Sequence, residues 1–196
     1  MGQRARRARN RAPDVRCCYA PRMPTLELPN DDARIVALAV RYHLARPGSE
    51  TDSTTLQRRD DGLLSVDGAL VPQLGNALVR LDLTAYQLHR LDEGLLGVTN
   101  ELKAYEMARR RSAVPGFAET LAALYPSLAP DAATDDDASA EQEDALDLVE
   151  RVVALRRRLA TAVAEARATL ERDRERAALA AAEARRAQRP WWRFWG

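Results

Sequence analysis

The residues with the most distinctive chemistry are six near the end of the chain, where aromatic and cationic side chains are mixed. They are Arg189, Trp191, Trp192, Arg193, Phe194 and Trp195. All three tryptophans of the chain fall in this Trp/Arg tail, which we define as residues 189–196. Exposed tryptophan is unfavourably hydrated, so the tail is expected to bury its rings against another surface.

Four interpretations of the Trp/Arg tail remain open. Bases of single-stranded nucleic acid can stack on the rings while Arg189 and Arg193 contact phosphates, which requires no particular base sequence. The tail can insert at a membrane interface, where tryptophan and arginine both partition well. It can dock as a terminal peptide in a groove of a partner protein, or fold back onto its own chain. The preceding basic residues, Arg185 and Arg186 among them, favour the first two interpretations.

The sequence contains no motif that predicts catalysis. Nucleophile-elbow, zinc-protease, phosphate-loop and dinucleotide-binding motifs are all absent. Of the only two histidines, His43 and His89, His43 lies among apolar neighbours with no second metal ligand nearby in the sequence, and Cys17 and Cys18 are adjacent. Adjacent cysteines disfavour both a mutual disulfide and a zinc site. We therefore predict a non-enzymatic protein without a cofactor or metal.

Charge is distributed unevenly, although the formal net charge is only +1. Residues 1–22 are basic, residues 131–150 contain acids but no base, and residues 151–196 are basic again. The start of the chain is either a basic disordered arm or sequence upstream of a true start at Met23. No apolar run is long enough to span a membrane, and the basic start lacks the apolar segment of a signal peptide. These features favour a cytoplasmic location.

Two shorter elements are expected before the main apolar stripe. The apolar spacing of residues 31–46 predicts a helix, which Pro47 and Gly48 would end. Residues 54–66 contain an Asp-Gly step between two short runs. That pattern predicts either a β-hairpin or an ordinary surface turn.

The longest apolar stripe lies between Pro72 and Arg111, where apolar residues recur every three or four positions. This spacing gives a helix one continuous apolar face, along which a core must form. Within the stripe, Gly94 and Gly97 either let a second backbone approach closely or allow a bend. A shorter helix with a similar face is expected over residues 117–128.

The first part of this stripe allows a second interpretation, as two helices over about 72–81 and 84–93. Thr84 and Gln87 have the Thr-x-x-Gln spacing of a capping box, which marks a helix start. Residues 74–94 thereby resemble the helix-turn-helix of many DNA-binding domains. The resemblance implies that the second helix presents Tyr86, Gln87, His89 and Arg90 to base edges or phosphates. A single amphipathic helix accounts for the same leucines without DNA.

The remaining chain predicts a linker followed by one long helix. Residues 129–144 are acidic and small, which is typical of a flexible linker. The apolar positions of residues 145–188 predict a helix, whose stripe over 145–170 can pack on the central stripe or form a homodimeric coiled coil. After Leu170 almost nothing is left to bury. The helix is therefore expected to leave the body as a solvated rod some 25 Å long.

Together these features predict a mostly α-helical protein: a helical domain over residues 23–128, with an optional short β-hairpin near 54–66, and a long C-terminal helix with a free aromatic tail. In size, in its arginine- and alanine-rich composition and in this tail, the chain resembles small DNA-damage-response proteins of radiation-resistant bacteria. That resemblance implies binding of DNA, with single-stranded DNA favoured. The alternative is a coiled-coil scaffold or adaptor whose tail binds a membrane surface or a partner protein.

Overall fold

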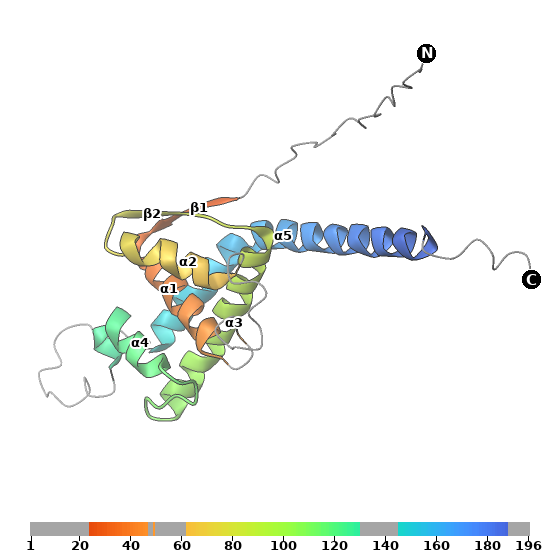
Figure 1. The fold of residues 1–196 in the computed structure, drawn as a ribbon. Helices are drawn as coiled ribbons and strands as arrows, with labels where there is room; N and C mark the ends of the chain where they lie inside the picture. The colour runs from red at the N-terminus through yellow and green to blue at the C-terminus, as the bar shows by residue number, and fades with distance from the viewer. Residues whose placement is uncertain (1–23, 47–48, 50–61, 130–144, 188–196) are drawn as a thin grey trace, which may run out of the picture.

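The computed structural model describes residues 24–46, 49, 62–129 and 145–187, and helices dominate it (Figure 1). In chain order the elements are β1 (Thr25–Pro29), α1 (Asn30–Ala45), α2 (Leu63–Leu70), the 3-10 helix η2 (Val71–Gln73), β2 (Leu78–Asp82), α3 (Ala85–Met107), α4 (Phe117–Leu124), the 3-10 helix η3 (Pro126–Leu128) and α5 (Ala145–Ala187). The prediction of a mostly helical fold with a long C-terminal helix is confirmed. The helix predicted over 31–46 is α1.

β1 and β2 form a two-stranded antiparallel sheet from segments far apart in the sequence. Val79 and Leu81 of β2 are buried, and the residues that alternate with them are exposed. This period of two is that of a strand with one face on a core. The side-chain amide of Gln73 occupies one edge of β2. It accepts a hydrogen bond from the Arg80 N–H and donates one to the Arg80 carbonyl, both at 3.1 Å.

Two predictions for this region are wrong. Residues 72–81 are not a helix, because η2 is followed by a turn at Gly75, where φ is +101°, and then by β2. The β-hairpin near 54–66 is not formed as predicted, because Leu63 to Val66 begin α2. Residues 54–61 lie outside the described part of the chain. β2 instead pairs with β1, which is distant in the sequence, so the residues near β2 alone do not predict the sheet.

α1 and α3 cross closely at the two glycines of α3. A Cβ atom added at Gly94 would lie 2.8 Å from the carbonyl oxygen of Ala39, and one at Gly97 would overlap the ring of Tyr42. The prediction that these glycines let a second backbone approach is confirmed at Gly94. A larger side chain at either position would push α1 away from α3.

α4 covers the C-terminal part of the α1–α3 pair. The Phe117 ring makes edge-to-face contacts with Tyr42 and Tyr105, with ring centroids 5.9 and 6.1 Å apart. The single helix predicted over 117–128 is divided into α4 and η3. Pro126 has no N–H to donate and restricts the conformation of the residue before it, which ends α4.

α5 starts against α3 and ends far from the body (Figure 1). The buried side chains of its first half recur every three or four residues and pack on α3: Leu148, Val149, Val152, Leu155, Leu159, Val163 and Ala166. This is the first of the two alternatives predicted for the 145–170 stripe. A homodimer through the same stripe would require α5 to leave α3.

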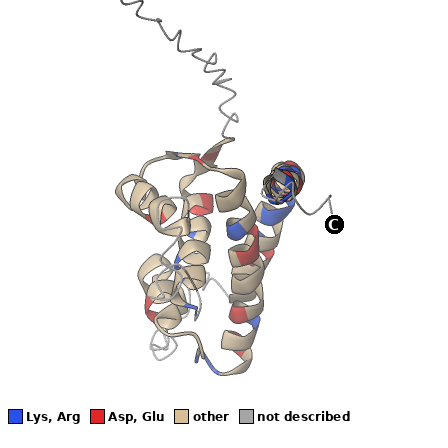
Figure 2. Ribbon diagram, turned by 45° about the vertical axis from the view of Figure 1, so that its right-hand side comes forward, with Lys and Arg blue, Asp and Glu red and all other residues tan. Residues whose placement is uncertain are grey.

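From Glu171 to Arg186, nearly every side chain of α5 is exposed. At about 1.5 Å per residue this segment is about 25 Å long, as predicted for the rod. Figure 2 views it almost end-on and shows basic and acidic residues on several sides. We call residues 171–187 the arm and the rest of the described chain the body.

Candidate functional site

The start of α3 is fixed by Thr84 and Gln87. The Gln87 N–H donates to Thr84 Oγ1 at 3.1 Å and the Thr84 N–H donates to Gln87 Oε1 at 2.8 Å, so the predicted capping box is confirmed. Gln87 Nε2 also donates to the Gly62 carbonyl at 3.2 Å and to Ser65 Oγ at 2.9 Å. Gln87 is only 6% exposed. Its amide therefore joins α3 to α2 and is not presented to a base edge, contrary to the prediction.

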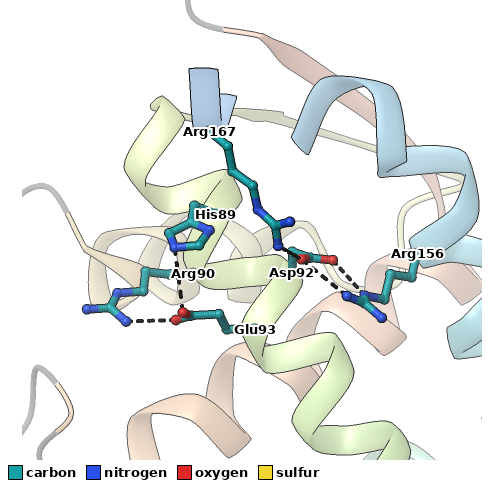
Figure 3. A network of polar contacts seen from close by, with 6 residues as sticks. All are labelled: His89, Arg90, Asp92, Glu93, Arg156 and Arg167. Carbon is teal, nitrogen blue, oxygen red and sulfur yellow. Dashed lines mark hydrogen bonds and ion pairs between the residues drawn. The ribbon is translucent and has the colours of Figure 1, made fainter. Parts of the chain in front are cut away.

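The other three residues predicted to contact DNA from this helix lie beside one carboxylate, that of Glu93. Arg90 Nη1 lies 2.7 Å from Glu93 Oε2, and His89 Nε2 lies 3.5 Å from Glu93 Oε1 (Figure 3). Arg90 also donates from Nε to the Tyr86 hydroxyl at 3.0 Å, and its guanidinium lies 5.1 Å from the centre of the Tyr86 ring. The one arginine of this predicted surface is thus already paired within α3.

The pKa values of the Arg90–Glu93 pair shift in the directions that a stable ion pair requires. Burial alone would lower the pKa of Arg90, but hydrogen bonds to Glu93 and Tyr86 outweigh it and raise that pKa. Burial would raise the pKa of Glu93, but the Arg90 hydrogen bond and the charges of Arg90, His89 and His43 lower it. The start of α3 therefore offers little uncompensated positive charge to a phosphate.

The helix-turn-helix predicted over 74–94 has only its second helix. β2 takes the place of the first helix, and α3 begins at Ala85 as predicted. With Gln87 buried and Arg90 paired, the body offers a poor DNA-reading surface at this position.

The best-defined polar site among the described residues joins α3 to α5. The side chain of Asp92 is 6% exposed and lies between two arginines (Figure 3). Asp92 Oδ1 accepts from Arg156 Nε at 2.6 Å, and Asp92 Oδ2 accepts from Arg167 Nη2 at 2.6 Å and from Arg156 Nη2 at 3.4 Å. We call these three residues the Asp92 clamp.

The spacing of the two arginines explains how both reach one carboxylate. Arg156 and Arg167 are eleven residues apart, which is about three helical turns, so they lie on one side of α5. A buried carboxylate without partners would be costly, and here both oxygens accept charge-assisted hydrogen bonds. The hydrogen bond to Asp92 raises the pKa of Arg156 more than burial lowers it. The clamp thereby sets the position of α5 along α3.

The Asp92 clamp was not predicted from the sequence. Asp92 follows Leu88 by four residues and precedes Leu95 by three, so it lies at the edge of the apolar stripe of α3. Arg156 and Arg167 each follow a buried residue of the α5 stripe. The sequence contains one carboxylate beside the apolar stripe of α3 and two arginines beside the apolar stripe of α5. These residues can be recognised as an ion-pair site only when α3 and α5 are known to pack together.

The remaining predicted site residues belong to the end of the chain. Arg185 and Arg186 lie on the last exposed turn of α5, where Arg185 Nε donates to the Ala181 carbonyl at 3.2 Å. Arg185 follows Arg167 by about 27 Å of helix, so these arginines and the start of α3 do not form one compact surface. The other six residues lie outside the described residues: Arg189, Trp191, Trp192, Arg193, Phe194 and Trp195.

Within residues 24–46, 49, 62–129 and 145–187, no three or more His, Cys, Asp or Glu side chains gather as metal ligands would. No helix of that part is long and apolar enough to cross a membrane. Comparison with protein-family models, curated proteins and solved structures found no match. The resemblance to DNA-damage-response proteins therefore stays a prediction.

Proposed function

We propose that this protein is a non-enzymatic adaptor, in which the body carries the arm and the Trp/Arg tail attaches the arm to a membrane surface. The observation that carries this proposal is the exposed arm. Its side chains add almost nothing to the core, and Leu179 is 65% exposed. A helix that continues beyond the body without packing on it has the geometry of a spacer that holds its end away from the body.

The residues at the end of the arm support attachment to a membrane surface. Arg185 and Arg186 are exposed on the last turn of α5, directly before the tail. Cations near an anionic leaflet contribute about 1 kcal/mol each, and tryptophan rings favour the headgroup region. Attachment of this kind lies in the interface and needs no membrane-spanning helix.

Binding of single-stranded DNA is the second candidate, and the same exposed Arg185 and Arg186 favour it. Phosphates would lie near these arginines while bases stack on the tail. A part in the DNA damage response belongs with this candidate. In either case the contacts lie at the end of the arm, because the start of α3 has its glutamine buried and its arginine paired.

Tryptophan emission separates the two candidates, because Trp191, Trp192 and Trp195 are the only tryptophans and all lie in the tail. The full chain is titrated with phosphatidylcholine vesicles, with phosphatidylcholine–phosphatidylserine vesicles, and with a single-stranded oligonucleotide. The adaptor predicts a blue shift on the mixed vesicles that persists at moderate salt, because ring burial is not screened. DNA binding predicts quenching by the oligonucleotide that weakens steeply with salt.

A chain that ends at Gln188 is the matched control, since it retains all of α5 but lacks the tail. Partition of the full chain, but not of this control, into vesicle pellets supports the adaptor. Absence of any vesicle effect on the full chain, together with salt-sensitive oligonucleotide binding, would replace the adaptor with the second candidate.

A further inference from the structure

The arm contains a second copy of the segment that forms the Asp92 clamp. Residues 156–167 read RRRLATAVAEAR and residues 174–185 read RERAALAAAEAR, which are identical at eight of twelve positions. The copies are eighteen residues apart, or about five helical turns, so each residue of the second copy lies on the same side of α5 as its counterpart. Arg174 and Arg185 thus repeat both the spacing and the direction of Arg156 and Arg167.

The two copies differ in the partners of their arginines. In the body, Arg156 and Arg167 share Asp92. In the arm, Arg174 and Arg185 are exposed, and neither has a carboxylate partner among the residues that the structure describes. The arm also repeats Arg158 of the body, as Arg176. That arginine is neutralised locally, by Asp173 at 2.7 Å.

The two copies also differ in their apolar side chains. Leu159 and Val163 are buried against α3 in the first copy, and the corresponding residues of the second copy are Ala177 and Ala181. The arm therefore retains the charged part of the clamp without the bulky part. A helix packed on this face would come closer to the backbone of α5 and would have to supply the large side chains itself.

We propose that Arg174 and Arg185 bind one carboxylate on a helix of a partner protein, as Arg156 and Arg167 bind Asp92 of α3. The partner helix carries an Asp or Glu flanked by large apolar residues that fill the space above Ala177 and Ala181. This names a partner class for the adaptor and relies on the proposed function only for its biological role. The contact itself does not depend on what the tail binds.

Charge favours an acidic helix over a polyanion. The arm holds four acids and five arginines, so its net charge is only +1. Glu171, Glu175 and Glu183 would repel a continuous phosphate backbone, whereas a single carboxylate needs only the pair of arginines. A second copy of this chain is a poorer fit, because its Asp92 is already held by its own α5.

The probe for this site is a labelled synthetic peptide with the sequence of residues 84–107, which places large apolar residues around Asp92. Its affinity for the full chain is measured by fluorescence anisotropy. Arg174→Ala with Arg185→Ala, or Asp92→Asn in the peptide, should weaken binding at least about tenfold, the scale of a lost charge-assisted contact. Arg172→Ala with Arg186→Ala removes equal charge from other sides of α5 and should change the affinity less than about twofold.

Three results would overturn the inference. They are no binding of the peptide to the unaltered chain, equal losses in the two double variants, and self-association of the unaltered chain that needs Arg174 and Arg185. The vesicle titration separates this test from that of the proposed function. A variant with Arg174→Ala alone, which leaves Arg185 and Arg186 in place beside the tail, should bind the peptide more weakly but retain the vesicle-dependent shift in tryptophan emission.

Discussion

The first half of α5 (145–170) and the arm share a repeated segment of twelve residues, identical at eight positions, yet the first half is part of the core and the arm is exposed. Both halves contain the same frame of arginine, alanine and glutamate. The first half differs by a few large apolar residues, such as Leu155 and Val163, and by a carboxylate within reach on α3. Helix formation therefore depends on the shared frame, and docking depends on a small number of bulky and charged contacts.

The largest expected effect on stability is that of replacing Leu155, in the first half of α5, and Leu179 in the arm serves as its comparison. Leu155 is 1% exposed, so Leu155→Ala should lower the free energy of unfolding by about 2–5 kcal/mol. Leu179→Ala in the arm should change it by less than about 0.5 kcal/mol. Urea unfolding followed by circular dichroism measures both. Similar losses in the two variants would show that the arm packs on something in the free protein.

The next largest effect is expected from the carboxylate of the Asp92 clamp. Asp92→Ala leaves Arg156 and Arg167 side by side without an anion and should destabilise the protein by about 2–3 kcal/mol. Asp173→Ala removes an exposed carboxylate in the arm and should lower the free energy of unfolding by less than about 0.5 kcal/mol. Thermal unfolding of both variants tests this. A small loss for Asp92→Ala would mean that apolar contacts alone position α5.

Arg156 and Arg174 hold the same position in the two copies of the repeat, and their alanine variants should differ in stability by a smaller amount. Arg156→Ala should cost about 1–2 kcal/mol, because it leaves a buried carboxylate with one partner fewer. Arg174→Ala should leave stability within about 0.5 kcal/mol, since no body contact is lost. Equal melting temperatures for the two variants would contradict the claim that the first half of α5 is held by Asp92 and the arm is not.

The smallest expected effect is a pH dependence of stability that comes from Glu93 in the body. The pKa of Glu93 is lowered in the folded protein, so its contribution to stability is present above the unfolded pKa of about 4.3 and is lost as pH falls through the lower folded value. Glu93→Gln should remove that part of the acid-induced loss, under about 1 kcal/mol because the pair is partly exposed. Unfolding curves from pH 7 to 3 measure it, with Glu183→Gln as the control.

Local periodicity predicted the three longest helices, α1, α3 and α5, because their apolar faces are long. α1, α3 and α5 repeat apolar residues over several turns, and Thr84 with Gln87 marks the start of α3. The exposure of the arm was predictable because Leu179 is its one large apolar residue. β2 was missed because Leu78 and Leu81 satisfy a helical spacing as well. Its strand conformation is set by β1, about fifty residues away in the sequence.

The candidate sites were harder to predict because they depend on contacts between distant segments. Gln87 is polar and near a helix start, which fits both a capping residue and a DNA contact. Its burial follows from the position of α2. Asp92 was not identified because its two partners lie on α5. Arginine is so common in this chain that neither partner was conspicuous.

Hydrogen exchange along α5 tests the central claim most directly, because it compares the two halves within one molecule. The full chain is studied at two concentrations about tenfold apart, with peptide-level mass spectrometry. Amides of residues 148–166 should exchange only with global unfolding, and those of residues 171–187 should exchange far faster at both concentrations. Equal protection of the two halves at both concentrations would contradict the account, because it would place the arm in the core.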